Sequence, residues 1–290
     1  MSSAIKPVRK AVFPVAGLGT RLLPATKTMP KEMLTVVDRP LIQYAVDEAR
    51  EAGIEQMIFV TGRGKSSLID YFDKGFELEA TMEKAGKSLD PLGASNAGYG
   101  EIVSVRQQQP LRLGHAVWCA RHIIGDEPFA VLLPDDLMVG TPGALKQMVD
   151  AYATLGGNIV CAQEVPADKT ASYGIITPGA RDGDATEVRG LVEKPAPADA
   201  PSRLGVVGRY ILQPQVMDLL GAGERGAGGE IQLTDAMAKL IGNQPFHALT
   251  VDAVRHDCGD KAGFVLANLA IALDRPDLAP AIEEFLANRA

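Results

Sequence analysis

The sequence is poor in the residues that mark several specialised classes of protein. Among its 290 residues are three cysteines, Cys119, Cys161 and Cys258, and they form no Cys-x-x-Cys pair. This spacing argues against a zinc site and against a disulfide scaffold, so we expect a reducing, cytoplasmic compartment. A membrane-spanning helix needs about 18 consecutive apolar residues, and no apolar stretch of the sequence is that long. We therefore expect no association with a membrane.

Positive charge is also in deficit. Lys and Arg total 29 against 36 Asp and Glu, and the chain has one Trp and no basic run. Such a chain is a poor candidate for binding nucleic acid. An anionic small molecule must be attracted by a local cluster of positive side chains against a mildly repulsive overall field.

Basic residues precede an apolar run over residues 11–19, but Pro14, Gly17 and Gly19 interrupt it. We expect a buried strand there instead of a signal peptide.

The hydrophobic pattern predicts an α/β fold. In the first half, strand-like runs (10–15, 57–61, 102–107, 130–133, 159–165) alternate with helical patterns (41–49, 65–72, 115–124, 144–155), and residues 77–99 read as a helix and then a loop. This alternation predicts a mostly parallel sheet flanked by helices, with right-handed crossovers. Beyond residue 165, short β runs (173–177, 186–193, 205–212) precede helices near 214–220, 231–242, 261–273 and 280–289. We predict one Rossmann-like domain whose distal half adds a β-rich lobe.

A glycine loop follows the first strand, over Ala16-Gly17-Leu18-Gly19-Thr20-Arg21. Glycines at this place let the backbone approach a ligand closely and point amides at an anion. One alternative is a dinucleotide-binding fingerprint, since Asp38 stands about 20 residues downstream, where a ribose-binding acid is expected. Against it, Leu22 occupies the third glycine position, and Pro24 and Pro30 interrupt the helix that this fold requires. A plain structural turn is the third interpretation.

Cations gather directly after this loop. Arg21, Lys27 and Lys31 lie within one short, proline-punctuated stretch. At an effective dielectric constant of about 20, one charge at about 4 Å from a phosphate oxygen gains roughly 4 kcal/mol of Coulomb attraction before desolvation. Two or three such charges are enough to hold a triphosphate, and a solvated basic loop is the alternative.

Polar side chains also follow three later strands. The Gln107 amide presents a donor and an acceptor together, which suits the edge of a base, although an exposed glutamine is the ordinary alternative. Asp135 and Asp136 end an apolar strand, where a carboxylate is a natural ligand for Mg²⁺, the alternative being a cap on a turn. Glu193 and Lys194 close a β run, where they can bind vicinal hydroxyls and a phosphate or simply form a surface turn.

The segment Gly17–Thr26, together with Pro30-Lys31-Glu32-Met33-Leu34, resembles the signature of the sugar-nucleotide pyrophosphorylases. The resemblance extends from residue 10 to about residue 270. It implies a nucleotidyltransferase fold in one domain over 1–290, with a nucleotide-binding half (about 8–165), a sugar-phosphate-binding half (about 166–275) and a C-terminal helix (276–290).

The resemblance also implies roles for individual residues. Nucleotide contacts fall on Ala16, Gly17, Gly19, Gln107 and Gly114. Catalytic phosphate contacts fall on Arg21, Lys31 and Lys194. Sugar contacts fall on Gly174, Glu193, Lys194, Val206 and Gly208, and Mg²⁺ ligands on Asp135 and Asp257. The choice of Asp135 over Asp136 rests on the family pattern. The glycine-rich stretch 221–229 reads as a mobile rim over the sugar site, with a simple flexible loop as the alternative.

The activity that the resemblance implies is Mg²⁺-assisted transfer of a uridylyl group from UTP to glucose 1-phosphate by direct in-line displacement. A phosphomonoester is mostly a dianion at neutral pH, so no general base or covalent nucleophile is required. Alternatives are a thymidylyltransferase on the same sugar phosphate, an NAD-dependent oxidoreductase and a non-catalytic regulatory homologue. The last would lose the phosphate-binding lysines or the metal acids, and all are present. We expect a homo-oligomer, a dimer or tetramer, with the apolar C-terminal helix as an interface or as plain core.

Overall fold

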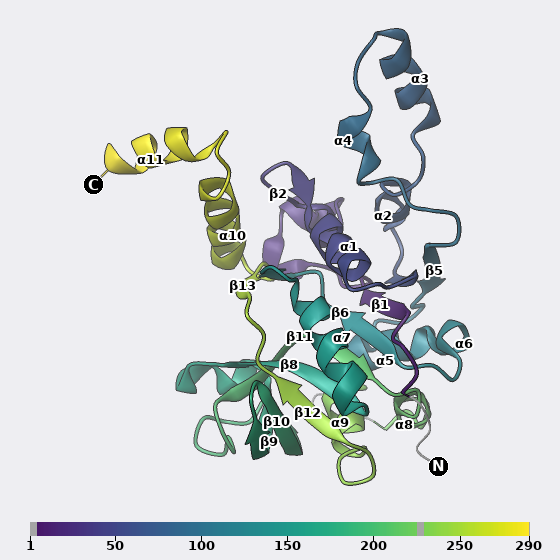
Figure 1. The fold of residues 1–290 in the computed structure, drawn as a ribbon, viewed down its shortest axis with the longest axis vertical. Helices are drawn as coiled ribbons and strands as arrows, with labels where there is room; N and C mark the ends of the chain where they lie inside the picture. The colour runs from purple at the N-terminus through teal and green to yellow at the C-terminus, as the bar shows by residue number, and fades with distance from the viewer. Residues whose placement is uncertain (1–4, 225–228, 290) are drawn as a thin grey trace.

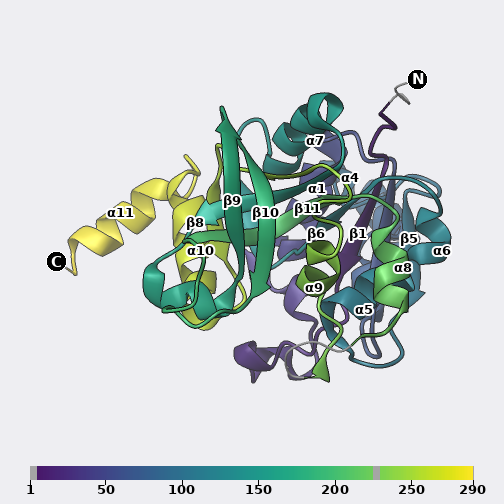
Figure 2. The same ribbon diagram turned by 90° about the horizontal axis from the view of Figure 1, so that it is seen from below.

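The computed structural model describes residues 5–224 and 229–289. This part of the chain forms a nine-stranded sheet with helices on both faces (Figures 1 and 2). The strand order is β5 (Ile102–Arg106), β4 (Gln56–Thr61), β1 (Lys10–Pro14), β6 (Phe129–Leu132), β11 (Leu204–Leu212), β8 (Asn158–Glu164), β12 (Phe246–Leu249), β10 (Ala185–Glu193) and β9 (Gly174–Asp182). The predicted α/β fold is confirmed.

Strand direction changes across the sheet. β5, β4, β1 and β6 are parallel, as the alternating pattern of the first half predicts. β11 runs antiparallel to both of its neighbours, β6 and β8. Beyond it, β12 is parallel to β8, and β10 pairs antiparallel with both β12 and β9. The sheet is therefore mixed, and its antiparallel part is the β-rich lobe expected of the distal half.

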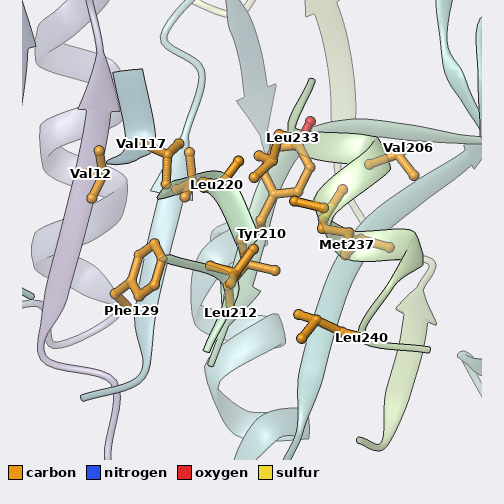
Figure 3. Packing of buried hydrophobic residues seen from close by; sticks show 14 of the residues in the cluster. Val12, Val117, Phe129, Val206, Tyr210, Leu212, Leu220, Leu233, Met237 and Leu240 are labelled. Atoms are coloured by element: carbon orange, nitrogen blue, oxygen red, sulfur yellow. The ribbon is translucent and has the colours of Figure 1, made fainter. Parts of the chain in front are cut away.

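Each face of the sheet packs against its own set of helices, because side chains along a strand point alternately to opposite faces. Val12 of β1 belongs to one buried cluster, whereas Ala11 and Phe13 belong to the other. The first face is covered by α5 (Arg112–Cys119), α8 (Val216–Gly221) and α9 (Leu233–Ala238), and the second by α1 (Leu41–Glu51), α2 (Ser66–Asp70) and α7 (Ala144–Leu155). Figure 3 shows the first cluster, with the strand side chains Val12, Phe129, Tyr210 and Leu212 meeting residues of these helices.

Short turns replace a helix after β1. Three 3₁₀ turns (Thr20–Leu22, Ala25–Lys27, Lys31–Met33) occupy the stretch that a dinucleotide-binding fold would make one continuous helix. Pro24 and Pro30 immediately precede the second and third turns, and a proline, which lacks an N–H group, interrupts a continuous helix. The Asp38 carboxylate, the candidate ribose ligand of that alternative, accepts a hydrogen bond of 2.7 Å from Nη1 of Arg275.

Two short two-stranded ribbons lie outside the main sheet and were not predicted. β7 (Asp136–Val139) pairs antiparallel with β13 (Val254–Asp257), with Asp136 opposite Asp257. β2 (Thr35–Val36) and β3 (Arg39–Pro40) form a second small ribbon. The remaining elements are α3 (Phe76–Lys84), α4 (Asp90–Gly93), α6 (Arg121–Ile124), a 3₁₀ helix (Ala167–Ser172), α10 (Lys261–Leu273) and α11 (Ala279–Ala287). The β7–β13 pair matters most, because it brings two segments with acidic residues together.

The C-terminal helix α11 projects from the body in both ribbon views (Figures 1 and 2). None of its described side chains is buried, so it is not part of the core. Among residues 5–224 and 229–289, no helix has both the length and the apolar character needed to cross a membrane. The predicted rim over 221–229 falls partly on residues 225–228, which lie outside the described residues.

Candidate active site

A cavity of about 550 Å³ opens beside the carboxyl ends of β1 and β6. It is lined by residues far apart in the sequence, among them Ala16, Gly17, Gly19, Arg21, Lys31, Gln107, Asp135 and Gly259. Ligands in open α/β sheets bind at this edge, beyond the carboxyl ends of the strands. The structure therefore gathers the glycine loop, its cations, the candidate base ligand and one candidate metal ligand around a single space of ligand size.

The glycine loop packs tightly against Lys31. A Cβ atom added to Gly19 would lie 3.1 Å from Cγ2 of Thr26 and 3.3 Å from Cβ of Lys31. Gly19 also has φ of 65°, a left-handed conformation that favours glycine. The Thr26 hydroxyl donates a hydrogen bond of 2.7 Å to the Gly19 carbonyl and fixes the loop. Glycine is thus required here to let the loop backbone and the lysine share one wall of the cavity.

Lys31 forms an ion pair with Asp135, with 2.5 Å between Nζ and Oδ2. Burial opposes the charge on Lys31, but Asp135 outweighs it, so the pKa of Lys31 is raised. Burial likewise opposes ionisation of Asp135, yet the nearby Lys31 ammonium keeps the pKa of that carboxyl below its usual value. Both groups are therefore charged at neutral pH, and the cavity holds a cation and an anion in direct contact.

A second carboxylate converges on Asp135. A Cβ atom added to Gly259 would lie 2.9 Å from Oδ1 of Asp257, 3.3 Å from Oδ2 of Asp135 and 3.4 Å from Nη2 of Arg21. Mg²⁺ prefers oxygen ligands and is commonly held by one or two carboxylates together with substrate phosphates. The part of the chain that the structure describes contains no group of three or more His, Cys, Asp or Glu residues that could hold a metal. The donor set fits a divalent ion shared with phosphate and not an all-protein metal cage.

Asp136 has a different environment from its neighbour Asp135. It is buried, accepts a hydrogen bond of 2.8 Å from the Gly208 amide, and receives Nε of Arg255 at 2.9 Å. Burial raises the pKa of Asp136, while Arg255 acts in the opposite direction. The same Arg255 donates to the Tyr173 hydroxyl at 3.2 Å and lies 3.7 Å from Asp257. Asp136 is therefore a structural partner that joins β7, β11 and β13.

The predicted sugar ligands gather beside Tyr173, where β9 begins and β10 ends. Glu193 forms an ion pair with Lys194, with Oε1 and Nζ 3.0 Å apart, and the Lys194 amide donates to the Tyr173 carbonyl at 2.9 Å. A Cβ atom added to Gly174 would lie 3.5 Å from Oε2 of Glu193 and 3.1 Å from the Thr234 hydroxyl. Lys194 has φ of 48°, a strained conformation for a non-glycine residue that is concentrated at functional sites.

Three predicted contact residues pack against protein. A Cβ atom added to Gly114 would lie 2.6 Å from the carbonyl oxygen of Ile231, and one added to Gly208 would lie 2.5 Å from Cβ of Asp136. Val206 is buried at 7% exposure. The close approach expected at Gly114 and Gly208 is therefore present, but the structure shows protein atoms as the approaching groups.

A buried ion pair behind the cavity was not among the predicted site residues. Arg209, 1% exposed, donates to both carboxylate oxygens of Glu48, at 2.9 and 2.6 Å. Its Nη1 also donates to the Leu133 carbonyl at 3.1 Å, just before Pro134-Asp135. The sequence feature that could have revealed this pair is an arginine inside an apolar strand. A buried charge requires a partner, so such an arginine predicts a buried acidic residue beside it. Arg255 gave a weaker signal and was seen only as a neighbour of Asp257.

Comparison with known proteins agrees with this arrangement. Residues 10–272 match the family model for nucleotidyl transferases. A UTP–glucose-1-phosphate uridylyltransferase from Komagataeibacter xylinus is 56% identical over 259 residues, covering 89% of this chain and 91% of that protein. A UTP-bound UGPase from Acinetobacter baumannii superposes with a TM-score of 0.86 at 42% identity, covering 97% and 99% of the two chains. A UDP-glucose pyrophosphorylase complexed with UDP-glucose gives 0.83 at 41% identity, covering 92% of this chain and all of the other. The chain belongs to the nucleotidyl transferase family.

Proposed function

We propose that this protein transfers the uridylyl group of UTP to glucose 1-phosphate, forming UDP-glucose and pyrophosphate. The observation that carries the proposal is a cavity lined by the glycine loop, Arg21, Lys31 and Asp135, with the Asp257 carboxylate beside the lining residue Gly259. The relatives support the choice of substrates, since one is named for this reaction and two solved neighbours hold UTP or UDP-glucose.

We assign the nucleotide to the half at about 8–165. The loop at Ala16, Gly17 and Gly19 offers backbone amides to the nucleotide, and Gln107 meets the base from the opposite wall. Arg21 and Lys31 bind the phosphates, because each brings a positive charge to the cavity. Gly114 supports this wall from behind, where its amide donates to the Ile231 carbonyl at 3.1 Å.

We assign the sugar phosphate to the half at about 166–275. The Glu193 carboxylate accepts hydrogen bonds from sugar hydroxyls, Lys194 pairs with the phosphate, and Gly174 leaves room for the ring. Val206 and Gly208 act from the buried layer beneath. This division is supported by the positions of Glu193 and Lys194, which lie at the end of β10 and are not among the residues that line the cavity of the glycine loop.

The reaction is a direct displacement in this scheme. An oxygen of the glucose 1-phosphate phosphoryl group attacks the α-phosphorus of UTP, the bond from that phosphorus to the β-phosphate bridge oxygen breaks, and pyrophosphate leaves. The attacking phosphate is already largely a dianion near pH 7, so no protein base is needed. Arg21, Lys31 and Lys194 compensate the charge that develops on the phosphates, which makes catalysis a matter of positioning and electrostatics. Mg²⁺ held by Asp135 and Asp257 would neutralise phosphate charge further.

The decisive experiment measures pyrophosphate release with a panel of nucleoside triphosphates and hexose 1-phosphates. We expect UTP with glucose 1-phosphate to give the highest kcat/KM, and dTTP is the comparison for thymidylyl transfer. Calorimetry with NAD tests the oxidoreductase alternative, for which we expect no binding because 3₁₀ turns follow the glycine loop. Absence of pyrophosphate release with UTP and every sugar phosphate would refute the proposed function.

We also propose that the enzyme is a cytoplasmic homo-oligomer that uses α10 and α11 as its interface with a second copy. These helices expose Val265, Leu266, Leu273, Phe285 and Leu286. A helix of nine residues is marginal on its own in water, so α11 gains most from packing against a further surface. Light scattering coupled to size exclusion tests this, with Phe285→Asp expected to lower the measured mass.

A further inference from the structure

The orientation of the Gln107 side chain is fixed by two hydrogen bonds. Its Nε2 lies 3.0 Å from the carbonyl oxygen of Arg112 and 3.0 Å from Nδ1 of His115. A side-chain amide carries two N–H donors and one carbonyl acceptor. Because both donors are engaged by these two partners, the group that Gln107 has left to offer a ligand in the cavity is the acceptor Oε1.

The two partners hold the amide in different ways. The Arg112 carbonyl can only accept, so a flipped amide would place Oε1 against it. An imidazole nitrogen accepts only while it carries no proton, and a protonated His115 would present an N–H to the Gln107 N–H. The position of Oε1 is therefore conditional on the protonation state of His115.

An acceptor at this place selects among bases. Uracil and thymine carry a ring N–H between two carbonyls, whereas cytosine has an acceptor nitrogen at the same ring position. A site that presents an acceptor hydrogen-bonds to the first two and leaves two acceptors facing each other with cytosine. A mismatch of this kind discriminates more strongly than a difference of shape in an apolar pocket.

We propose that His115 is a positioning residue that accepts a hydrogen bond from Gln107, turns the Gln107 carbonyl toward the nucleotide and thereby sets the preference for uracil over cytosine. The inference rests on the proposed function, because it takes the cavity as the nucleotide site. His115 acts through Gln107, and its predicted effect is on base choice and on the pH dependence of binding.

The surroundings of His115 favour the unprotonated ring. The ring stacks on Trp118 with centroids 5.8 Å apart, and the Arg121 guanidinium lies 3.6 Å from the centroid of the same indole. Burial and then Arg121 lower the pKa of His115, so the ring is neutral at neutral pH. In its Nε2–H tautomer, Nδ1 is the acceptor for the Gln107 amide. Nδ1 also lies 3.9 Å from Sγ of Cys119.

Charged groups on the neighbouring segments are mostly cationic or already paired. Arg106 and Arg121 share the shallow hollow that His115 lines, Arg112 is paired with Glu230, and Lys10 of β1 donates to the Ile123 carbonyl. On the helices packed against α5, Asp218 is exposed and Asp235 has Glu193 and Lys239 as its electrostatic neighbours. This arrangement does not promote protonation of His115.

The test compares binding of UDP-glucose and CDP-glucose by calorimetry over a pH series from about 8 down to about 5, because the pKa of His115 lies below its ordinary value. These ligands carry phosphodiester groups that do not titrate in this range, so the pH dependence reports on the protein. The variants are His115→Asn, whose carbonyl can replace the acceptor Nδ1 without titrating, and His115→Leu, which removes the acceptor. His122→Asn on α6 is the matched control for a histidine outside the cavity and the hollow beside it.

We expect the wild type to prefer UDP-glucose by about 100-fold or more at about pH 8 and to lose affinity for it as the pH falls through the pKa of His115. His115→Asn should keep the preference within about threefold and lose most of the pH dependence. His115→Leu should reduce the preference by about tenfold or more with a near-native circular dichroism spectrum, and His122→Asn should behave as the wild type.

Two results would overturn the proposal: an unchanged preference in folded His115→Leu, or a wild-type pH dependence in His115→Asn. If His115→Leu does not fold, the pH comparison of the wild type with His115→Asn decides alone. Failure of the wild type to bind UDP-glucose at any pH would refute the proposed function, and that outcome is distinct from a wild type that binds without regard to His115.

Discussion

We expect neutralisation of Asp136 to destabilise the fold and neutralisation of the adjacent Asp135 to impair the reaction. Asp136→Asn removes the charge from a buried ion pair in which Asp136 accepts from Arg255 and from the Gly208 amide. Removing one partner of such a pair costs about 3–5 kcal/mol, because the other charge stays buried. The asparagine side chain keeps one hydrogen-bond acceptor, so we expect the free energy of unfolding to fall by the lower end of this range, about 3 kcal/mol. For a chain of this size that corresponds to a fall in Tm of roughly 6–12 °C.

Asp135→Asn should spare the fold and impair the reaction. Its partner Lys31 lines the cavity, and the Asp135 and Lys31 side chains keep 22% and 17% exposure. Glu32 remains as a second anionic neighbour of Lys31, so we expect a smaller loss of stability than for Asp136→Asn. The pKa of Asp135 is lowered, so its ion pair is fully formed above the usual value of 3.8 and is lost only as the pH falls below it. Assays near neutral pH therefore compare a charged carboxylate with a neutral amide. We expect turnover to fall by about 10²–10³-fold.

The assay pairs thermal unfolding followed by circular dichroism with pyrophosphate release. Asp135→Asn should unfold near the wild-type Tm and be nearly inactive, whereas Asp136→Asn should unfold early. If Asp136→Asn instead keeps the native Tm and loses activity while Asp135→Asn remains active, the two carboxylates have been assigned the wrong roles.

Four further perturbations test the remaining assignments. Glu193→Gln should weaken use of glucose 1-phosphate by about 1–3 kcal/mol through the loss of charge-assisted hydrogen bonds, with UTP affinity unchanged in calorimetry; an equal loss of UTP binding without sugar would contradict the sugar assignment. Lys31→Ala should impair turnover together with UTP binding, whereas Lys194→Ala should lower turnover and leave UTP affinity within about threefold, or roughly 0.65 kcal/mol. A folded Lys194→Ala protein that no longer binds UTP would assign that lysine to the nucleotide. EDTA should abolish pyrophosphate release and added Mg²⁺ should restore it, so activity that survives complete chelation would exclude the metal ligands proposed at Asp135 and Asp257.

The elements that could be predicted from the sequence are those whose information is local. The helices at Ala144–Leu155 and Lys261–Leu273 begin and end where the sequence places them, because a continuous apolar stripe defines each helix. β7 and β13 were missed because Asp-Leu-Met-Val and Val-Arg-His-Asp carry little strand signal of their own. A side-chain hydrogen bond between the paired strands, from Arg255 to Asp136, joins residues 119 positions apart. No short stretch of the sequence contains both residues of that contact, so local patterns could not predict it.

The same distinction applies to the candidate site. Gln107 and Asp135 could be placed at one edge in advance because each follows a strand, and parallel strands end at one edge of a sheet. Arg21 and Lys31 were predicted instead from the stretch of cations that comes directly after the glycine loop. The sequence alone could not separate the roles of Asp135 and Asp136, which are neighbours in the chain but differ in what faces them. The orientation of Gln107 was also beyond prediction, since it depends on the relative positions of a strand end and a helix start.

The position of β11 limits how the enzyme can move. This strand belongs to the half of the sequence that we assign to the sugar phosphate. It nevertheless lies between β6 and β8, which belong to the half that we assign to the nucleotide, and it hydrogen-bonds to both. Swinging the halves apart as rigid bodies would break that ladder of backbone hydrogen bonds. Adjustment to substrates must therefore come from loops at the edge of the sheet, and a chain cut near residue 165 would leave its first fragment with β6 and β8 both lacking the strand that joins them.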